Sequence, residues 1–221
     1  MIFTTTKPTD EILKYLENDK KIFIVGCAQC STVCKTGGEE EVAAMKKILE
    51  AQGKVITGTV VMDPPCHLLE VKKRYRENRE AIEQCDSILV LTCGDGVQTV
   101  MEGTQKKVRP ALDTVFLGEV ERAGHFKETC SLCGECVLDS TGGLCPMTLC
   151  PKGLLNGPCG GSKEGKCEVD REKDCAWVLI YKRLSEIGEL DKIKTIKLPK
   201  DYSKVVKPRK LILEDFTKKK I

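Results

Sequence analysis

Apolar and polar positions divide the first half of the chain into short apolar runs separated by amphipathic stretches. Three runs rich in β-branched residues have the length of buried strands, and a fourth run is shorter; they lie at residues 21–26, 54–62, 87–92 and 115–117. Strands that alternate with helices are typical of parallel sheets, because parallel neighbours need a crossover connection. The runs therefore predict a parallel sheet.

Helical spacing of apolar residues fills the segments around these runs, at residues 10–18, 39–51, 68–84 and 97–105. Thr9 precedes the first of these segments and is a candidate N-cap. Residues 1–120 are thus expected to form an α/β domain with a Rossmann- or flavodoxin-like parallel sheet.

The second half shows little periodicity before residue 176. Glycines and prolines recur through residues 121–175, which predicts a loop-rich, cysteine-rich domain over residues 121–190. Near its end, Trp177, Ile180 and Leu184 share one helical face, and Gly188 suits the stop of that helix. Trp177 is interpreted as a core anchor. Residues 191–221 are expected to be an extended basic tail.

Cysteine is the residue type with most chemical meaning here, since the chain contains 14. Eight of them follow one another in the loop-rich half, opening with a Cys-x2-Cys-x2-Cys run: Cys130, Cys133, Cys136, Cys145, Cys150, Cys159, Cys167 and Cys175. Thiolates hold iron–sulfur clusters or zinc, and eight thiolates make two sets of four. The gap before Cys145 is longer than in a ferredoxin run, so the fourth ligand of the first set stays open.

Five more cysteines follow the predicted strands: Cys27, Cys30, Cys34, Cys66 and Cys93. The carboxyl ends of parallel strands form one edge of a sheet, where ligands bind. We therefore expect a third metal site, made by the first three of these cysteines with either Cys66 or Cys93. Cys85 falls at the opposite edge and is interpreted as a small buried apolar residue.

Weaker signals surround these cysteines. Gly37, Gly38, Gly94 and Gly96 are candidates for close backbone approach to a cofactor, with plain turns as the alternative. His67 and His125, the only histidines, are interpreted as structural. The sequence shows no pattern of nucleophile, acid or base, so no catalytic residue is predicted.

Charge and compartment narrow the function classes. The net charge is +3, but residues 192–221 carry +8 and the remainder −5. The basic tail interleaves apolar residues, which favours an arm packed on a partner or on its own body over a nucleic-acid contact. No signal-peptide core and no membrane span is recognisable, so we expect a cytoplasmic protein whose cysteines bind metal rather than form disulfides.

Specific motifs in the cysteine-rich half carry a family resemblance. The segments Gly142-Gly143-Leu144-Cys145-Pro146, the residues from Cys150-Pro151-Lys152-Gly153 to Pro158-Cys159-Gly160-Gly161, and Cys175-Ala176-Trp177 closely resemble the methylenetetrahydrofolate reductase C-terminal family. With its cysteine-bearing α/β half, the chain is similar to the small iron–sulfur subunit of two-subunit reductases of acetogenic and related anaerobic bacteria. The resemblance extends over nearly the whole chain and weakens in the basic tail.

The resemblance implies partners and cofactors. It implies a large flavin-containing reductase subunit with a TIM barrel, which reduces methylene- to methyl-tetrahydrofolate, and an electron donor such as ferredoxin or a hydrogenase- or dehydrogenase-linked carrier. The chain would pass electrons to that flavin through 4Fe-4S clusters, three by the cysteine count. The alternative is a structural or docking subunit with zinc in closed four-cysteine sites; zinc in one site and clusters in the others is a mixed form.

Overall fold

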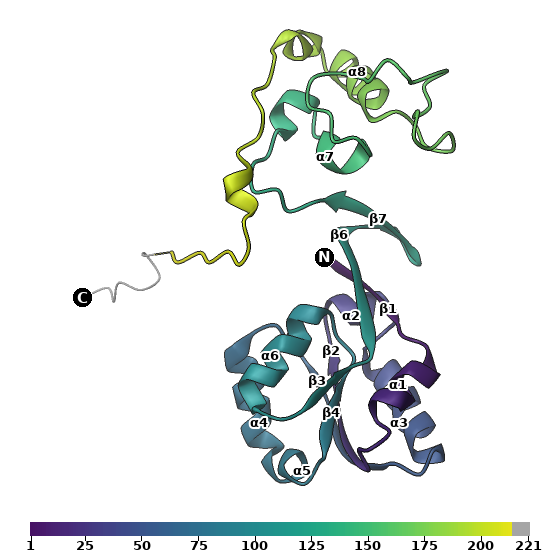
Figure 1. Ribbon diagram of the computed structural model, residues 1–221, viewed down its shortest axis with the longest axis vertical. Coiled ribbons are helices and arrows are strands. Elements are labelled where there is room, and N and C mark those ends of the chain that lie inside the picture. Colours follow the sequence, from purple (N-terminus) through teal and green to yellow (C-terminus); the bar gives the residue numbers. More distant parts are fainter. Residues whose placement is uncertain (214–221) are drawn as a thin grey trace, which may run out of the picture. The chain divides into compact units, whose positions relative to one another are not determined.

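The computed structural model describes residues 1–213 and divides the chain into two compact units, Met1–Lys127 and Glu128–Ile221 (Figure 1). The first unit contains mixed α/β structure and the second is mostly irregular, with short helices. No helix among the described residues is both long and apolar enough to cross a membrane.

A four-stranded parallel sheet forms the centre of the first unit. Its strands are β2 (Lys21–Cys27), β3 (Val55–Met62), β4 (Ser87–Val90) and β5 (Val108–Pro110), in the order β3-β2-β4-β5. The three long apolar runs of the sequence are therefore confirmed as strands. The prediction that residues 115–117 add the fourth strand is wrong, because that place belongs to β5, a run of three residues too short to show a pattern.

Helices cover both faces of this sheet (Figure 1). They are α1 (Thr9–Tyr15), α2 (Cys30–Val33), α3 (Glu39–Ala51), α4 (Leu68–Glu77), α5 (Arg79–Glu83) and α6 (Gly94–Thr104). One apolar core, with Ile24 and Leu89 from the sheet, packs on α1 and α3. The other, with Phe23 and Ile88, packs on α4, α5 and α6. Adjacent strand residues thus point to opposite cores, as the pleat requires.

Two helix details differ from the sequence prediction. Residues 68–84 form two helices instead of one, because Asn78 leaves the helical conformation and its side chain donates a hydrogen bond back to the carbonyl of Arg74, at 3.0 Å. Thr9 is the first residue of α1 and not its N-cap, which is Pro8. An asparagine can satisfy local backbone groups and so compete with helix continuation.

A second, antiparallel sheet was not predicted. It consists of β1 (Ile2–Thr6), β6 (Leu112–Arg122) and β7 (His125–Cys130), in the order β1-β6-β7. Phe3 stacks against Phe116 and Phe126, with ring centroids 4.9 and 4.7 Å away. Residues 115–117 lie within β6, so they form a strand as predicted, but in the antiparallel sheet and not in the parallel one.

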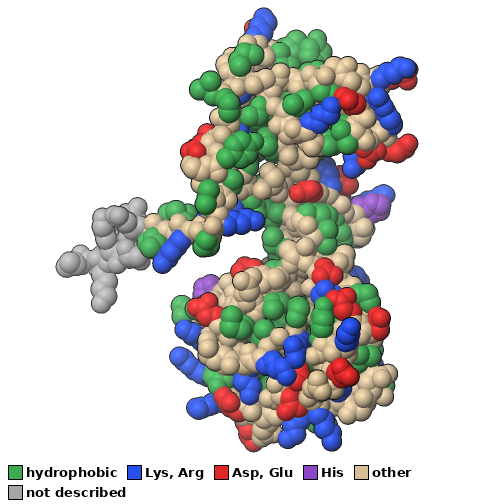
Figure 2. All heavy atoms as spheres, viewed as in Figure 1, with side chains coloured by type: hydrophobic (Ala, Val, Ile, Leu, Met, Phe, Trp, Pro, Cys, Tyr) green, Lys and Arg blue, Asp and Glu red, His purple; other side chains and the backbone are tan. Residues whose placement is uncertain are grey.

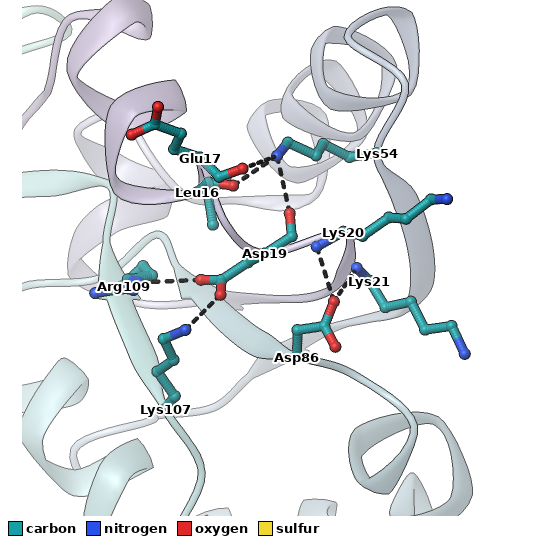
Figure 3. A network of polar contacts seen from close by, with 9 residues as sticks. All are labelled: Leu16, Glu17, Asp19, Lys20, Lys21, Lys54, Asp86, Lys107 and Arg109. Atoms are coloured by element: carbon teal, nitrogen blue, oxygen red, sulfur yellow. Dashed lines mark hydrogen bonds and ion pairs between the residues drawn. The ribbon is translucent and has the colours of Figure 1, made fainter.

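A polar network closes the amino-terminal edge of the parallel sheet (Figure 3). The buried carboxylate of Asp19 accepts hydrogen bonds from Lys107 and Arg109, the latter at 3.3 Å. Asp86 accepts from the backbone N–H groups of Lys20 and Lys21, at 2.8 and 2.7 Å. These contacts tie the start of β2 to β4 and β5, at the edge opposite the strand-end cysteines.

The second unit contains α7 (Pro146–Leu149), α8 (Ala176–Glu186) and the 3-10 helices η1 (Leu138–Thr141), η2 (Leu190–Lys194) and η3 (Tyr202–Val205). Its small core centres on Trp177, Ile180 and Leu184 of α8. The Trp177 indole N–H also donates to the carbonyl of Leu154, at 2.9 Å. Gly188 follows the helix with a φ of +72°, which fits the predicted stop.

The described part of the basic tail after η2, residues 195–213, is here called the arm and contacts its own unit. The Asn156 side chain holds both backbone groups of Lys197, whereas the apolar side chains of Ile196 and Leu198 are 74% and 84% exposed. The arm is therefore fixed by polar contacts and does not bury these apolar residues. Residues 214–221, the end of the predicted tail, lie outside the described residues. On the face of the first unit seen in Figure 2, charges of both signs are interspersed.

Candidate metal centres

The structure divides the eight cysteines of the second unit into two sets of four. Cys130, Cys133, Cys136 and Cys145, here the first set, line a cavity of about 300 Å³. Cys150, Cys159, Cys167 and Cys175, here the second set, line a separate cavity of about 20 Å³. The first four cysteines along the chain therefore share one cavity and the last four share the other. Cys145 is the fourth cysteine of the cavity that the Cys-x2-Cys-x2-Cys run lines.

The loop that follows β7 carries the first cysteines of the first set, and its backbone reverses direction between them. Cys130 ends β7, and Leu132 and Gly134 then take left-handed conformations with φ of +56° and +74°. The N–H of Leu132 points at the Cys130 sulfur, with 3.4 Å between N and Sγ. Backbone N–H groups directed at thiolate sulfurs are a common feature of cluster-binding loops, since they offset negative charge.

A basic side chain from the arm reaches the first set. The Nζ atom of Lys200 lies 3.0 Å from the Sγ atom of Cys133, and the side chain is buried, at 7% exposure. The ammonium group also donates to the carbonyl of Glu135. The hydrogen bond from Lys200 lowers the pKa of the Cys133 thiol, which favours the thiolate form that binds metals.

The second set is built from loops that close on the start of α8. Cys175 is buried and is the N-cap residue of that helix, and its N–H donates to the carbonyl of Gly165, at 2.8 Å. The N–H of Cys167 donates to Lys173, at 2.9 Å. Trp177 lines the same cavity, so the core anchor of this unit is also a wall of the second set.

One carboxylate competes for a thiol of the second set. Glu168 accepts a hydrogen bond from the Cys159 thiol, at 3.0 Å, and pairs with Lys152, at 2.9 Å. A Cβ atom on Gly161 would stand 1.9 Å from the Glu168 carboxylate, so a larger residue there would displace the Glu168 side chain from Cys159. Binding of a metal by Cys159 would replace the thiol proton and break this hydrogen bond.

The strand-end cysteines of the first unit also gather. Burial raises the pKa of the Cys66 thiol, and the nearby Asp95, Cys93 and Cys27 raise it further. Burial likewise raises the pKa of Cys93, to which Cys30 adds. Cys27 ends β2, Cys30 begins α2, Cys66 follows β3 and Cys93 precedes α6, so these four cysteines, here the N-terminal set, lie at the carboxyl edge of the sheet.

Cys34 points elsewhere. Its sulfur contacts the carbonyl of Ile2 in β1, at 4.0 Å. The sequence left open whether Cys66 or Cys93 completes the set with Cys34. Cys27, Cys30, Cys66 and Cys93 are therefore the ligand set that we test first, and the set with Cys34 stays the alternative that the spacing predicts.

Glycines bring backbone close to the N-terminal set. The backbone N–H groups of Gly96 and Asp95 act against burial and lower the pKa of the Cys93 thiol, and a Cβ atom on Gly96 would meet the Thr92 hydroxyl at 2.5 Å. Gly94 donates to the Thr114 hydroxyl, at 2.8 Å. Gly37 packs against the end of β4, since a Cβ atom there would lie 1.9 Å from the Leu91 carbonyl oxygen. A role of these glycines toward a cofactor stays a prediction.

Gly38 and the remaining candidate residues have structural contacts. Gly38 is the N-cap of α3, and its N–H donates to Glu41, at 2.9 Å. His67 caps α4 by accepting from the N–H of Glu70, at 3.3 Å, and His125 is exposed at the start of β7. Cys85 is buried in the core beside α5, where its thiol donates to the carbonyl of Ile82, at 3.1 Å.

Geometry and donor chemistry together bear on which metal could fit. Within residues 1–213, no group of three or more His, Cys, Asp or Glu side chains is arranged to hold a single metal ion. The first set has donors of the kind that a cluster uses: four thiols line one cavity, the N–H of Leu132 is directed at the Cys130 sulfur, and a buried ammonium lies beside Cys133.

Comparison with known proteins bears on the C-terminal part of the chain. Residues 109–203 match the family described as "Methylene-tetrahydrofolate reductase C terminal". The matched segment contains both four-cysteine sets of the second unit, as well as Lys200, and leaves the N-terminal set outside. No curated protein and no solved structure matches the chain. The match relates this part of the chain to methylenetetrahydrofolate reductase and supports the resemblance seen in its motifs.

Sequence reasoning missed several residues at these sites. Lys200, Glu135 and Arg209 come together at the first set, although Lys200 is 67 residues from Cys133. Glu168 reaches Cys159 in the second set. The only sequence signal for Lys200 is the basic character of the tail, which does not predict which lysine contacts a cysteine in the folded structure.

Proposed function

We propose that the chain is an electron-transfer iron–sulfur subunit of a methylenetetrahydrofolate reductase complex. The observation that carries the proposal is the partition of the eight cysteines into two sets of four, each around its own cavity, within the segment that matches the reductase family. Complete sets of four thiolates are what 4Fe-4S clusters require.

Each set of residues has a defined role in this proposal. The three sets of four cysteines supply thiolate ligands, and the N–H groups of Leu132 and Gly96 stabilise negative charge at the sulfurs. Iron–sulfur clusters, when bound, store and pass single electrons. The residues of the chain hold the ligands and limit the access of water; no side chain needs to transfer a proton.

The partners follow from the chemistry of the reaction. Reduction of a methylene to a methyl group takes two electrons, which a flavin can collect singly and deliver as a pair. A flavin-containing large subunit is thus the proposed acceptor, and a one-electron carrier such as ferredoxin the proposed donor. The chain would therefore act beside a catalytic subunit.

Metal analysis of protein purified without oxygen tests the proposal. We expect a brown protein with about twelve iron and twelve sulfide per chain, as three 4Fe-4S clusters require. Addition of reduced ferredoxin should bleach the visible absorption, and addition of the oxidised flavoprotein subunit should restore it. A colourless chain without sulfide would overturn the electron-transfer function.

Zinc in the second set is a second candidate, favoured by the loops of this set, which close on the start of α8. The four thiols do not surround a single ion in the present arrangement, so zinc binding would draw these loops together. A closed four-cysteine zinc site is compact and has no redox chemistry, so the second set would then stabilise the unit or its docking surface. About one zinc and eight iron per chain, with zinc lost in Cys159→Ser, would assign this set to zinc.

A further inference from the structure

The arm covers the first set and is attached to its loop by several polar contacts. Glu135 accepts from the N–H of Asp201, at 2.9 Å, and pairs with Lys204, at 3.4 Å. Arg209 donates to the carbonyl of Leu132, at 2.9 Å. Lys200 and Arg209 both line the cavity that holds the four thiols. The arm is thus a structural part of the first set.

Lys200 differs from the other basic residues of the arm in its burial and in its partner. Its side chain is buried, whereas Lys204 is nearly half exposed. Within residues 1–213 Lys200 makes no ion pair with a carboxylate, because Glu135 pairs with Lys204 and offers Lys200 only its backbone carbonyl. A buried cation is costly unless a negative group compensates it, and the nearest such group is the Cys133 sulfur.

We propose that Lys200 is a positioning residue of the first set, whose ammonium group donates a hydrogen bond to the Cys133 sulfur and raises the reduction potential of the cluster held there. This inference rests on the proposed function. The physical reason is that reduction adds one negative charge to the site, and a fixed positive charge in a poorly solvated place stabilises the reduced form. One electron leaves the donor as the site gains one, and Lys200 keeps its protons.

Replacement of Lys200 in the full-length protein tests the inference. We would measure iron, sulfide and the midpoint potential by a redox titration followed by electron paramagnetic resonance, in wild type, Lys200→Met and Lys200→Arg. The signal lost in Cys133→Ser identifies the first set. We expect Lys200→Met to shift that midpoint to a more negative potential and Lys200→Arg to keep it close to the wild-type value.

A matched control comes from the same arm. Lys204→Met removes a lysine that holds the arm through Glu135 but does not reach a sulfur, so its midpoint should shift much less than that of Lys200→Met. If Lys200→Met loses the first-set signal while Lys204→Met keeps it, the positioning role is supported as well. An unchanged midpoint in Lys200→Met, or equal loss of the signal in both variants, overturns the specific role of Lys200.

Failure of the inference and failure of the proposed function give different results. A wild-type protein without iron and sulfide overturns the electron-transfer function, and with it the role assigned to Lys200. If wild type has its full iron content and Lys200→Met has the same first-set midpoint as wild type, the inference alone is overturned.

Discussion

Asp19 is the residue on which the amino-terminal edge of the parallel sheet depends. Its carboxylate is 1% exposed, while its partners Lys107 and Arg109 are partly exposed. Asp19→Asn would leave both cations without their carboxylate. Because the partners remain in contact with water, we expect the variant to lose about 2 kcal/mol of unfolding free energy, less than for a fully buried pair. Urea denaturation at neutral pH measures this loss, with the exposed Asp10→Asn as a control.

The same loss should depend on pH. Burial alone would raise the pKa of Asp19, but hydrogen bonds from Lys107 and Arg109 outweigh burial and hold the pKa below its ordinary value. Because the folded-state pKa is depressed, the Asp19 carboxylate stabilises the fold fully at pH values above its unfolded-state pKa of about 3.9. This stabilisation is lost as the pH falls through the folded-state pKa. The difference in stability between wild type and Asp19→Asn should therefore be constant near neutral pH and shrink as the pH falls below the unfolded-state value of about 3.9. A difference that does not shrink as the pH falls further would contradict this account.

A comparison of Cys66 and Cys34 tests the N-terminal set. Cys66 lies within electrostatic reach of Cys27 and Cys93, whereas the sulfur of Cys34 contacts the carbonyl of Ile2. We expect Cys66→Ser to lose about four iron per chain and Cys34→Ser to lose none, because one 4Fe-4S cluster holds four. Iron analysis measures both. Loss of iron in Cys34→Ser with full retention in Cys66→Ser would restore the ligand set that the spacing alone suggested.

Spacing places the strand-end cysteines at this edge, but it does not predict how their side chains point. A cysteine that follows a parallel strand lies at the carboxyl edge of the sheet, whatever the order of the strands. The direction of Cys34 depends on β1, a strand paired with residues more than 100 positions away. Local pattern holds no information on such pairing.

At the scale of elements, the junction between α3 and β4 depends on a close backbone approach. A Cβ atom on Gly37 would stand 1.9 Å from the carbonyl oxygen of Leu91, and neither backbone segment can yield easily. We expect Gly37→Ala to destabilise the first unit by about 1–3 kcal/mol, the usual range for overpacking. Gly94→Ala is the matched control, because its nearest contact would be an ordinary 3.4 Å from the Thr114 hydroxyl. Thermal denaturation compares the two, and equal effects would refute the steric argument.

Elements defined by local periodicity were predictable, and elements defined by distant pairing were not. Residues 39–51 form α3 with the bounds that their helical spacing predicts. The antiparallel sheet was not predicted, because β1 and β6 are far apart in the sequence and neither apolar pattern indicates which strand it pairs with. The break between α4 and α5 at Asn78 also escaped, since the apolar spacing continues across it.

At the scale of the whole molecule, the second unit has a small apolar core, so we predict that its fold depends on the metal that we propose it binds. Its buried core is confined to a few residues around α8, and much of the remainder is loop. Removal of metal should therefore unfold this unit while the first keeps its parallel sheet. Chelator treatment followed by limited proteolysis should degrade the chain beyond Glu128 and spare Met1–Lys127. Equal resistance of both units would show that the loops hold their fold without metal.

The arm gives the last test, because its contacts change what its removal should do. The composition of the tail predicts an arm that packs on a partner or on its own body, and an arm that served only a partner could be deleted without loss of cluster content. In the structure, Lys200, Lys204 and Arg209 instead hold the loop of the first set. A chain that ends after Ile196 should therefore lose about four iron of roughly twelve, while a chain that ends after Leu213 should keep all of them. If both truncated chains keep full iron but no longer co-purify with the flavoprotein, the arm serves the partner and not the metal site.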